Sequence, residues 1–164
     1  MAKERGQVEK RLAAEWMATQ YAGKTYYLNY PIGPVPLGIT TANSAYPWLR
    51  KVDGLAVVDS TVHVVEFKVW SPWDGLDKLP IYKLGVPRTP WLGSAKDYPV
   101  KMILVTPRSN PVIEATAALA GIEVVSVSGG WIDEVVQHIE WLWSREGRDA
   151  MEERRKLRAW LGLE

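Results

Sequence analysis

The sequence predicts a single α/β domain followed by a helical extension at the C-terminus. Segments with the apolar spacing of helices alternate with short runs rich in β-branched residues, in the order α-β-β-β-α-β-α-β-α. The 164 residues are 47% hydrophobic and 24% charged, which is ordinary for a folded domain and excludes a disordered chain. We expect the domain over residues 1–130 and the extension over residues 131–164.

Hydrophobic periodicity and turn residues define the expected elements. They are, in chain order, a helix over residues 4–20, strands over 25–30, 51–58 and 61–70, a helix over 76–84, a strand over 100–106, a helix over 111–120, a strand over 122–127 and a helical segment over 131–161.

Local residue types support the elements of the first half. Val8, Leu12 and Trp16 recur at helical spacing in the first helix. Pro31 is expected to end the first strand. The next two strands flank Asp59-Ser60, which has turn composition, so we expect them to form a hairpin.

Proline, asparagine and glycine residues indicate where the helices of the second half begin, end or are interrupted. Pro80 fits the helix over 76–84 only if it lies in the first turn. Asn110 is the expected N-cap of the helix over 111–120, and Gly121 ends it. In the extension, Gly147 is expected to interrupt an amphipathic helical pattern.

Composition excludes several classes of site. The chain has no cysteine and two histidines, which excludes a disulfide scaffold, a cysteine-based zinc site and a histidine-rich metal site. The net charge of +1 gives no global argument for nucleic-acid binding. No apolar run approaches the roughly 18 residues of a membrane span, and the N-terminus lacks the apolar core of a signal peptide. We therefore expect no membrane association and a cytoplasmic location.

The register of the predicted hairpin brings two carboxylates together. A two-residue turn at Asp59-Ser60 places Asp53 opposite Glu66, and a four-residue loop preserves this register. A three-residue loop would instead place Asp53 opposite Phe67. Opposed side chains lie about 4.5–5.5 Å apart at Cβ, so the two carboxylates would repel each other. A bound divalent cation is the simplest compensation.

Lys68 sharpens this prediction. It shares a strand face with Glu66, whereas Phe67 points the other way. The strand is otherwise rich in valine, and burying a glutamate and a lysine in it is costly without partners. The face would gather Asp53, Glu66 and Lys68, an oxygen-rich setting of the kind that Mg²⁺ prefers.

This spacing resembles the PD-(D/E)XK nuclease superfamily. Asp53 matches the first-strand acid, although Val52 precedes it where the superfamily has proline, and Glu66-Phe67-Lys68 matches the E-x-K motif. Many members, Holliday-junction resolvases among them, add a glutamate from the first helix; Gly6-Gln7-Val8-Glu9 is similar and nominates Glu9. RecB-type members carry Gln-x-x-x-Tyr on the next helix, and Lys78-Leu79-Pro80-Ile81-Tyr82 keeps the tyrosine with lysine in place of glutamine.

The resemblance implies a restriction-endonuclease-like αβββαβ core with a central mixed sheet, over roughly residues 4–127. It also implies Mg²⁺- or Mn²⁺-dependent hydrolysis of DNA, with single-stranded, branched and duplex substrates all open. Asp53, Glu66 and the Phe67 carbonyl would hold the metal, Glu9 would complete its ligands, and Lys68 would orient the attacking water. Such a nuclease is of the kind that phages or mobile elements encode.

Other interpretations of these residues stay open. Glu66 and Lys68 would also fit an ion pair on an exposed strand. Lys78 and Tyr82 are either accessory site residues or a surface lysine and a packing tyrosine. The near-neutral charge and the missing glutamine suit a catalytically inactive relative of these nucleases, such as a phage virion or DNA-packaging component. A sequence-specific restriction-type enzyme would need recognition elements for which the compact chain has little room.

The C-terminal helices offer two further possibilities. Their apolar face suits a homo-oligomer, since exposed apolar helix faces are typical of association sites. A basic cluster could follow a phosphate backbone, but neighbouring Glu152 and Glu153 make a solvated helix face the preferred interpretation. The cluster comprises Arg154, Arg155, Lys156 and Arg158.

Overall fold

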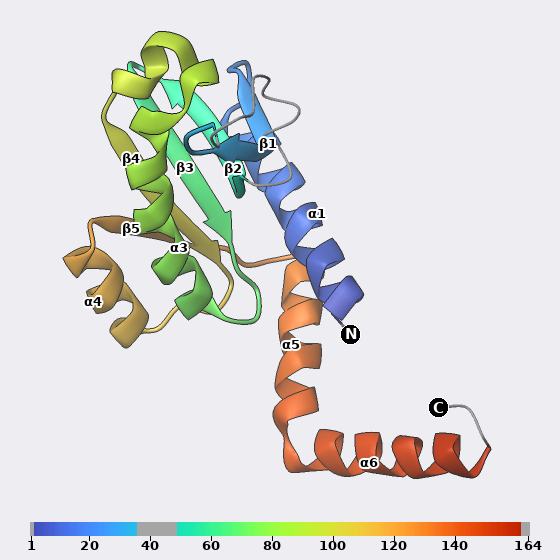
Figure 1. Ribbon diagram of the computed structural model, residues 1–164. Coiled ribbons are helices and arrows are strands. Elements are labelled where there is room, and N and C mark those ends of the chain that lie inside the picture. Colours follow the sequence, from blue (N-terminus) through green and yellow to red (C-terminus); the bar gives the residue numbers. More distant parts are fainter. Residues whose placement is uncertain (1, 36–48, 162–164) are drawn as a thin grey trace. The chain divides into compact units, whose positions relative to one another are not determined.

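A five-stranded mixed sheet carries the candidate site (Figure 1). The computed structural model describes residues 2–35 and 49–161. The strands lie in the spatial order β1-β2-β3-β4-β5. Strand β2 is antiparallel to both β1 and β3, whereas β4 is parallel to β3, and β5 is parallel to β4. Their bounds are β1 Tyr26–Ile32, β2 Arg50–Val58, β3 Thr61–Phe67, β4 Val100–Thr106 and β5 Ile122–Ser126.

Helices cover both faces of this sheet (Figure 1). Helix α1 (Ala2–Gln20) packs on one face, and α3 (Pro72–Gly85) and α4 (Pro111–Leu119) pack on the other. Two short 3₁₀ helices, η2 (Val86–Arg88) and η3 (Pro90–Asp97), connect α3 to β4. The fold is therefore α/β, and within residues 2–35 and 49–161 the expected order of helices and strands is found.

The packing of α1 depends on a glycine and an aromatic contact. A Cβ on Gly54 of β2 would come within 2.7 Å of Met17 Sδ, so glycine lets the helix approach the strand closely. Trp16 meets Phe67 of β3 edge to face, with ring centroids 5.6 Å apart. Phe67 thus faces α1, and its neighbour Glu66 points toward the opposite face.

The opposite face holds the main hydrophobic core. Leu55, Val64 and Leu104 of the sheet pack with Leu79 of α3 and Ile113 of α4. As expected, Asn110 caps α4, because its side chain accepts hydrogen bonds from two backbone N–H groups of the first turn.

Two prolines lie at other positions than expected: Pro31 lies within the strand it was expected to end, and Pro80 lies beyond the first turn of its helix. Pro31 pairs with Lys51 within β1, which reaches Ile32; an edge strand tolerates proline because one row of its backbone groups has no partner strand. Pro80 lies in the middle of α3, because the helix begins at Pro72 rather than at residue 76. The N-terminal position of Pro72 suits proline, and contacts with the sheet hold the helix across Pro80.

The third strand is shorter than predicted. It ends at Phe67 instead of residue 70, since the chain turns into α3 at Pro72. Lys68 lies one residue beyond the strand, but its backbone N–H still donates to the Val105 carbonyl at 3.0 Å. Its side chain is therefore still positioned by the sheet.

Residues 128–164 form a second compact unit. Its helices are α5 (Trp131–Trp143) and α6 (Arg145–Trp160). The break falls at Ser144, not at Gly147 as expected, and the Ser144 hydroxyl caps α6 by accepting from the Gly147 N–H at 3.1 Å. Gly147 is required for a different reason: a Cβ there would collide with the Trp141 carbonyl.

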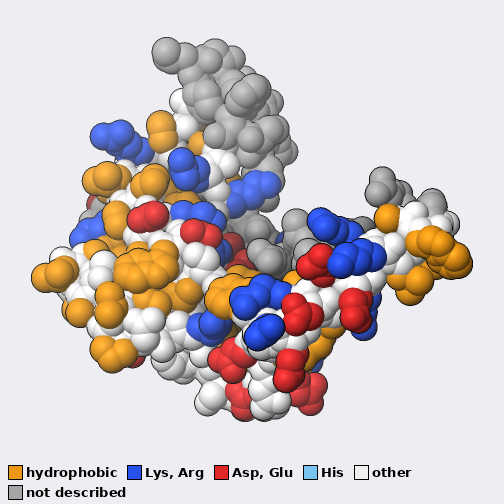
Figure 2. Space-filling view, turned by 90° about the horizontal axis from the view of Figure 1, so that it is seen from below, with side chains coloured by type: hydrophobic (Ala, Val, Ile, Leu, Met, Phe, Trp, Pro, Cys, Tyr) orange, Lys and Arg blue, Asp and Glu red, His pale blue; other side chains and the backbone are white. Residues whose placement is uncertain are grey.

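The basic cluster of α6 is mixed with acidic side chains. Figure 2 shows both charge types interspersed along this helix, with hydrophobic side chains gathered near its C-terminal end. Lys156 pairs with Glu152 at 3.0 Å, and Trp160 is 81% exposed. Association of two chains through these helices stays a prediction. Among the residues that the structure describes, no helix is both long and apolar enough to span a membrane.

Candidate active site

The hairpin of β2 and β3 has the predicted register. Asp59 and Ser60 both have positive φ angles, 48° and 57°, as a two-residue hairpin turn of type I′ requires. The last pair in the ladder is Gly54 with Val65, so Asp53 is the next residue on its strand toward the site. Asp53 Oδ2 accepts a hydrogen bond from the Phe67 N–H at 3.0 Å. The turn therefore brings Asp53 beside the Glu66-Phe67-Lys68 segment.

Glu66 is the most buried member of the site. Its side chain has no exposed surface, and Oε1 accepts hydrogen bonds from the ammonium groups of Lys68 and Lys78, both at 2.9 Å. Its second oxygen, Oε2, is buried and has no hydrogen-bond partner within the described ranges. This oxygen can therefore accept a further hydrogen bond or bind a metal ion.

The Lys68 ammonium lies among the oxygen atoms expected to bind the metal. Besides Glu66 Oε1, it contacts the Phe67 carbonyl at 2.9 Å, to which it donates a hydrogen bond. Asp53 Oδ2 lies 3.6 Å away and Glu9 Oε2 lies 3.7 Å away. Lys68 therefore takes the place of a cation at the centre of these groups.

Glu9 reaches the site from α1. Its Oε1 accepts a hydrogen bond from the Val69 N–H at 3.2 Å, which fixes the carboxylate beside Lys68. Glu9 and Asp53 line a cavity of about 240 Å³ together with Asn29 of β1. Their side chains are 25% and 30% exposed, so this cavity is the side from which solvent reaches the carboxylates.

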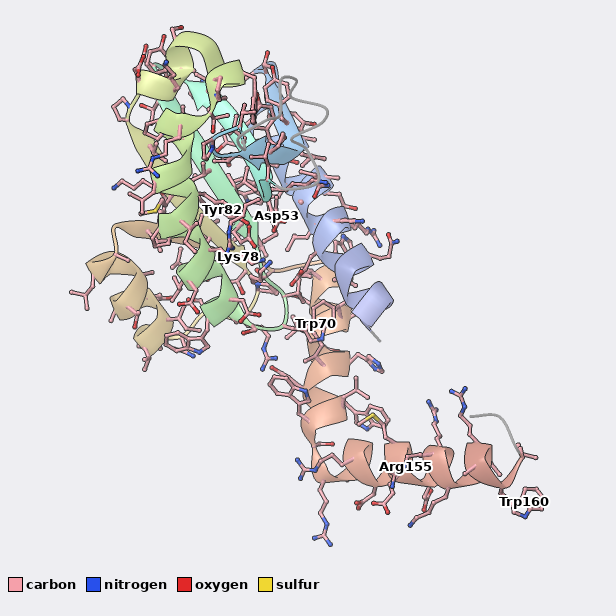
Figure 3. All side chains as sticks on the ribbon, in the orientation of Figure 1. Asp53, Trp70, Lys78, Tyr82, Arg155 and Trp160 are labelled. Carbon is pink, nitrogen blue, oxygen red and sulfur yellow. The ribbon has the colours of Figure 1, made fainter. Side chains whose placement is uncertain are left out.

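Helix α3 contributes Lys78 and Tyr82, which Figure 3 shows grouped with Asp53 between α3 and β2. Lys78 is bound to Glu66 and thus belongs to the site. The Tyr82 hydroxyl instead donates to the Lys51 carbonyl at 2.8 Å. Tyr82 lies one helical turn after Lys78 and is a packing residue, whose hydrogen bond holds α3 against β2.

The site shifts the pKa values of its own members. Burial raises the pKa of Glu66, and the charge of Asp53 adds to this, while Lys68 opposes it. Burial also raises the pKa of the Glu9 carboxyl. Burial lowers the pKa of the Lys68 ammonium, but the charges of Glu66 and Asp53 outweigh it, so the pKa lies above its ordinary value. Lys68 is therefore protonated at neutral pH.

The chemical types of the oxygen ligands in the site are those that a hard divalent cation prefers. Three carboxylates and a backbone carbonyl are the oxygen ligands that Mg²⁺ and Mn²⁺ take, and Glu66 Oε2 is available. In residues 2–35 and 49–161, however, no three acidic or histidine side chains already form a metal-binding group. The ammonium of Lys68 lies between them, so a metal and Lys68 would compete for the same oxygens.

No protein-family model, curated protein or solved structure matches this chain. The function is therefore inferred from the geometry of the site.

The sequence did not predict that Gly75 of α3 contributes to the site. Gly75 of α3 faces the site, and a Cβ there would lie 2.5 Å from Leu104 Cδ1 and 3.2 Å from Lys68 Cγ. Glycine thus allows α3 to lie directly over Glu66 and Lys68 and to deliver Lys78. A glycine within an amphipathic helix is a signal of such close approach, but its partner follows only from the tertiary structure.

Proposed function

We propose that this protein is a metal-dependent nuclease that hydrolyses DNA phosphodiester bonds, with a core like that of the PD-(D/E)XK superfamily. One observation carries the proposal. Glu66 is fully buried with a free Oε2, and the Lys68 ammonium next to it is surrounded by oxygens of Asp53, Glu9 and the Phe67 carbonyl. Three carboxylates gathered around one ammonium, with Glu66 fully buried, are costly to assemble, and a metal bound to their oxygens would account for the arrangement.

Four oxygen donors would hold Mg²⁺ or Mn²⁺. They are Asp53, Glu66, the Phe67 carbonyl and Glu9. A bound metal would supply an activated water at neutral pH and offset negative charge on the scissile phosphate. The hydrogen bonds from the Phe67 and Val69 N–H groups orient the Asp53 and Glu9 carboxylates toward the site.

Lys68 acts as a charged donor in this scheme. A lysine side chain is ordinarily protonated at neutral pH, so its ammonium is a donor in this scheme rather than a general base. Its three N–H donors can orient an attacking water and stabilise the negative charge that develops on the phosphate. Lys78 holds Glu66 in place from α3, so Glu66 keeps a cationic partner when Lys68 moves toward the substrate.

The test is a cleavage assay with a matched control. Wild-type protein is incubated with supercoiled plasmid, linear duplex and single-stranded DNA, in Mg²⁺, Mn²⁺ or EDTA. We expect cleavage only with metal, and none from Asp53→Asn or Lys68→Ala. Asp59→Asn in the hairpin turn is the control, because asparagine tolerates a positive φ and lies at the other end of the hairpin. Cleavage by both site variants at the wild-type rate would refute the proposal.

A second candidate is a catalytically inactive module with the same core, used in assembly. The near-neutral net charge, and Lys78 in the position where RecB-type members carry glutamine, favour it. Thermal unfolding in millimolar Mn²⁺ separates the two. The nuclease proposal predicts a higher melting temperature for wild type and Asp59→Asn, with no shift for Asp53→Asn. No shift in any of the three proteins would favour the assembly module.

A further inference from the structure

The cavity beside α1 continues the candidate site toward solvent. Its volume is about 240 Å³, and its walls include Glu9 of α1 and Asp53 of β2, two of the carboxylates of the site. On the opposite face of the sheet, α3 lies directly over Glu66 and Lys68, which are both buried. The cavity is therefore the side from which a substrate reaches the site.

Asn29 reaches this cavity through a break in β1. It lies opposite Asp53, and it is the residue that the ladder between β1 and β2 omits between Leu28 and Tyr30. Its φ is 51°, in the left-handed region that asparagine tolerates better than most residues. Successive residues of a regular strand point to opposite faces, yet Leu28 and Asn29 both line the cavity. The positive φ thus places Asn29 on the side of α1.

Two tyrosines that flank this position show the same break. Tyr27 and Tyr30 are three residues apart, so a regular strand would hold them on opposite faces. Their ring centroids nevertheless lie 5.0 Å apart. Such irregularities in a strand re-aim a side chain and often lie beside functional sites, and a non-glycine residue at positive φ costs energy. Asn29 is therefore a candidate for a role in the neighbouring site.

Lys10 is the cation among the residues that line the cavity. Helix α1 turns one face to it, formed by residues 6, 9, 10 and 13, whose spacing places them on the same side of a helix. Lys10 is exposed on this face, and Asn29 is exposed on the facing strand. Lysine and asparagine side chains are both common donors to phosphate oxygens in complexes with DNA. The cavity thus offers donors from two sides to an anion.

The charges around the cavity decide when an anion can bind. The three carboxylates of the site face the two ammonium groups of Lys68 and Lys78, which leaves one negative charge. Lys10 cancels this excess. A divalent cation on the carboxylates would make the balance positive and so favour a phosphate, and neutralising one carboxylate would act in the same direction.

We infer that this cavity is the subsite for the DNA backbone next to the cut, where Lys10 and the Asn29 side chain bind the phosphate that neighbours the scissile one. The inference rests on the proposed function and adds the residues that hold the substrate strand. The cavity is smaller than the roughly 300–1,000 Å³ of pockets for drug-sized ligands, which suits a phosphate with its sugar. Contacts of this kind position the strand and do not read its sequence.

Binding without cleavage tests the inference. All proteins carry Asp53→Asn, which removes cleavage in the proposed scheme and neutralises one carboxylate of the cavity. They are titrated in EDTA with a fluorescein-labelled oligothymidylate and with a mixed-sequence duplex of equal length. Fluorescence anisotropy is measured at several salt concentrations, and the variants are compared on the probe that the parent protein binds more tightly.

Lys10→Gln is compared with Arg11→Gln. The control removes the same charge from the next residue of α1, where Arg11 is paired with Glu15 at 2.8 Å. Lys10→Gln should lower the slope of log affinity against log salt by about 0.7–0.9, the value for one phosphate contact. At about 50 mM salt, this corresponds to a loss of about tenfold in affinity. Arg11→Gln should keep the slope of the parent protein.

Asn29→Gly is compared with Ser60→Gly in the hairpin turn, where φ is also positive. Glycine tolerates this backbone conformation, so the variant removes the amide and keeps the strand. Asn29→Gly should bind DNA about tenfold more weakly, because a hydrogen bond to a charged group is lost, and Ser60→Gly should bind like the parent protein. Asn29→Asp keeps the shape of the side chain but repels phosphate, so it should bind more weakly still.

Three results would each overturn the inference. They are equal salt slopes for Lys10→Gln and Arg11→Gln, parental affinity in both Asn29 variants, and no measurable binding of either probe. Cleavage in Mn²⁺ is then measured for the proteins without Asp53→Asn. Cavity-dependent binding without cleavage by wild type would leave the backbone subsite standing and refute the nuclease. Cleavage by wild type with binding that does not depend on the cavity would do the opposite.

Discussion

Replacing Lys68 with methionine tests whether its ammonium is the central cation of the site. Methionine keeps the length of the side chain but leaves Glu66 fully buried with Lys78 as its remaining partner. Removing one partner of a buried ion pair costs about 3–5 kcal/mol, and we expect about 3 kcal/mol because Lys78 stays bound. For a protein of this length, this lowers the melting temperature by about 6–12 °C. Chemical and thermal denaturation in EDTA measure both quantities.

The matched control is Lys101→Met on the neighbouring strand β4. Lys101 pairs with Glu123 at 2.6 Å, but both side chains are nearly half exposed. Such surface pairs contribute about 0–1 kcal/mol, so the control should lower the melting temperature by about 4 °C at most. If Lys68→Met costs no more than Lys101→Met, the Lys68 ammonium does not stabilise the buried carboxylate, and the reasoning about the site is wrong.

Three further predictions concern the surrounding structure. Gly147→Ala should destabilise the corner between α5 and α6, because the added Cβ would collide with the Trp141 carbonyl. The helical circular dichroism should then be lost at a lower temperature than in wild type, and an unchanged melting curve would contradict this. Burial, and then the charge of Lys101, lower the pKa of His63, so the unfolded chain binds a proton more readily than the folded protein. The free energy of unfolding should therefore fall as pH drops from about 7.5 to 5.5, and it should fall less steeply in His63→Gln. Equal slopes in the two proteins would refute this prediction. Tyr82→Phe should cost about 1 kcal/mol in denaturant unfolding, because the Lys51 carbonyl loses its hydrogen bond, whereas no change would mean that water replaces the hydroxyl.

Local chemistry predicted the hairpin and its register. Asp59 and Ser60 form the two-residue turn that fixes how β2 pairs with β3, so the proximity of Asp53 to Glu66 followed from sequence spacing. The Asn110 cap was predictable for the same reason, since capping is a contact between near neighbours in the chain.

Features set by tertiary contacts were not predictable. Pro31 was expected to end the first strand and Pro80 to lie in a first helical turn, but an edge position and packing against the sheet accommodate them inside β1 and α3. Whether Lys78 was a surface or a site residue depended on how closely α3 approaches the sheet, which Gly75 permits.

Anomalous diffraction from wild-type crystals soaked in Mn²⁺ tests the central claim most directly. The account predicts an anomalous peak between Asp53, Glu66 and the Phe67 carbonyl, with the Lys68 ammonium displaced from Glu66. No peak at this position, with Lys68 still bound to Glu66, would contradict it.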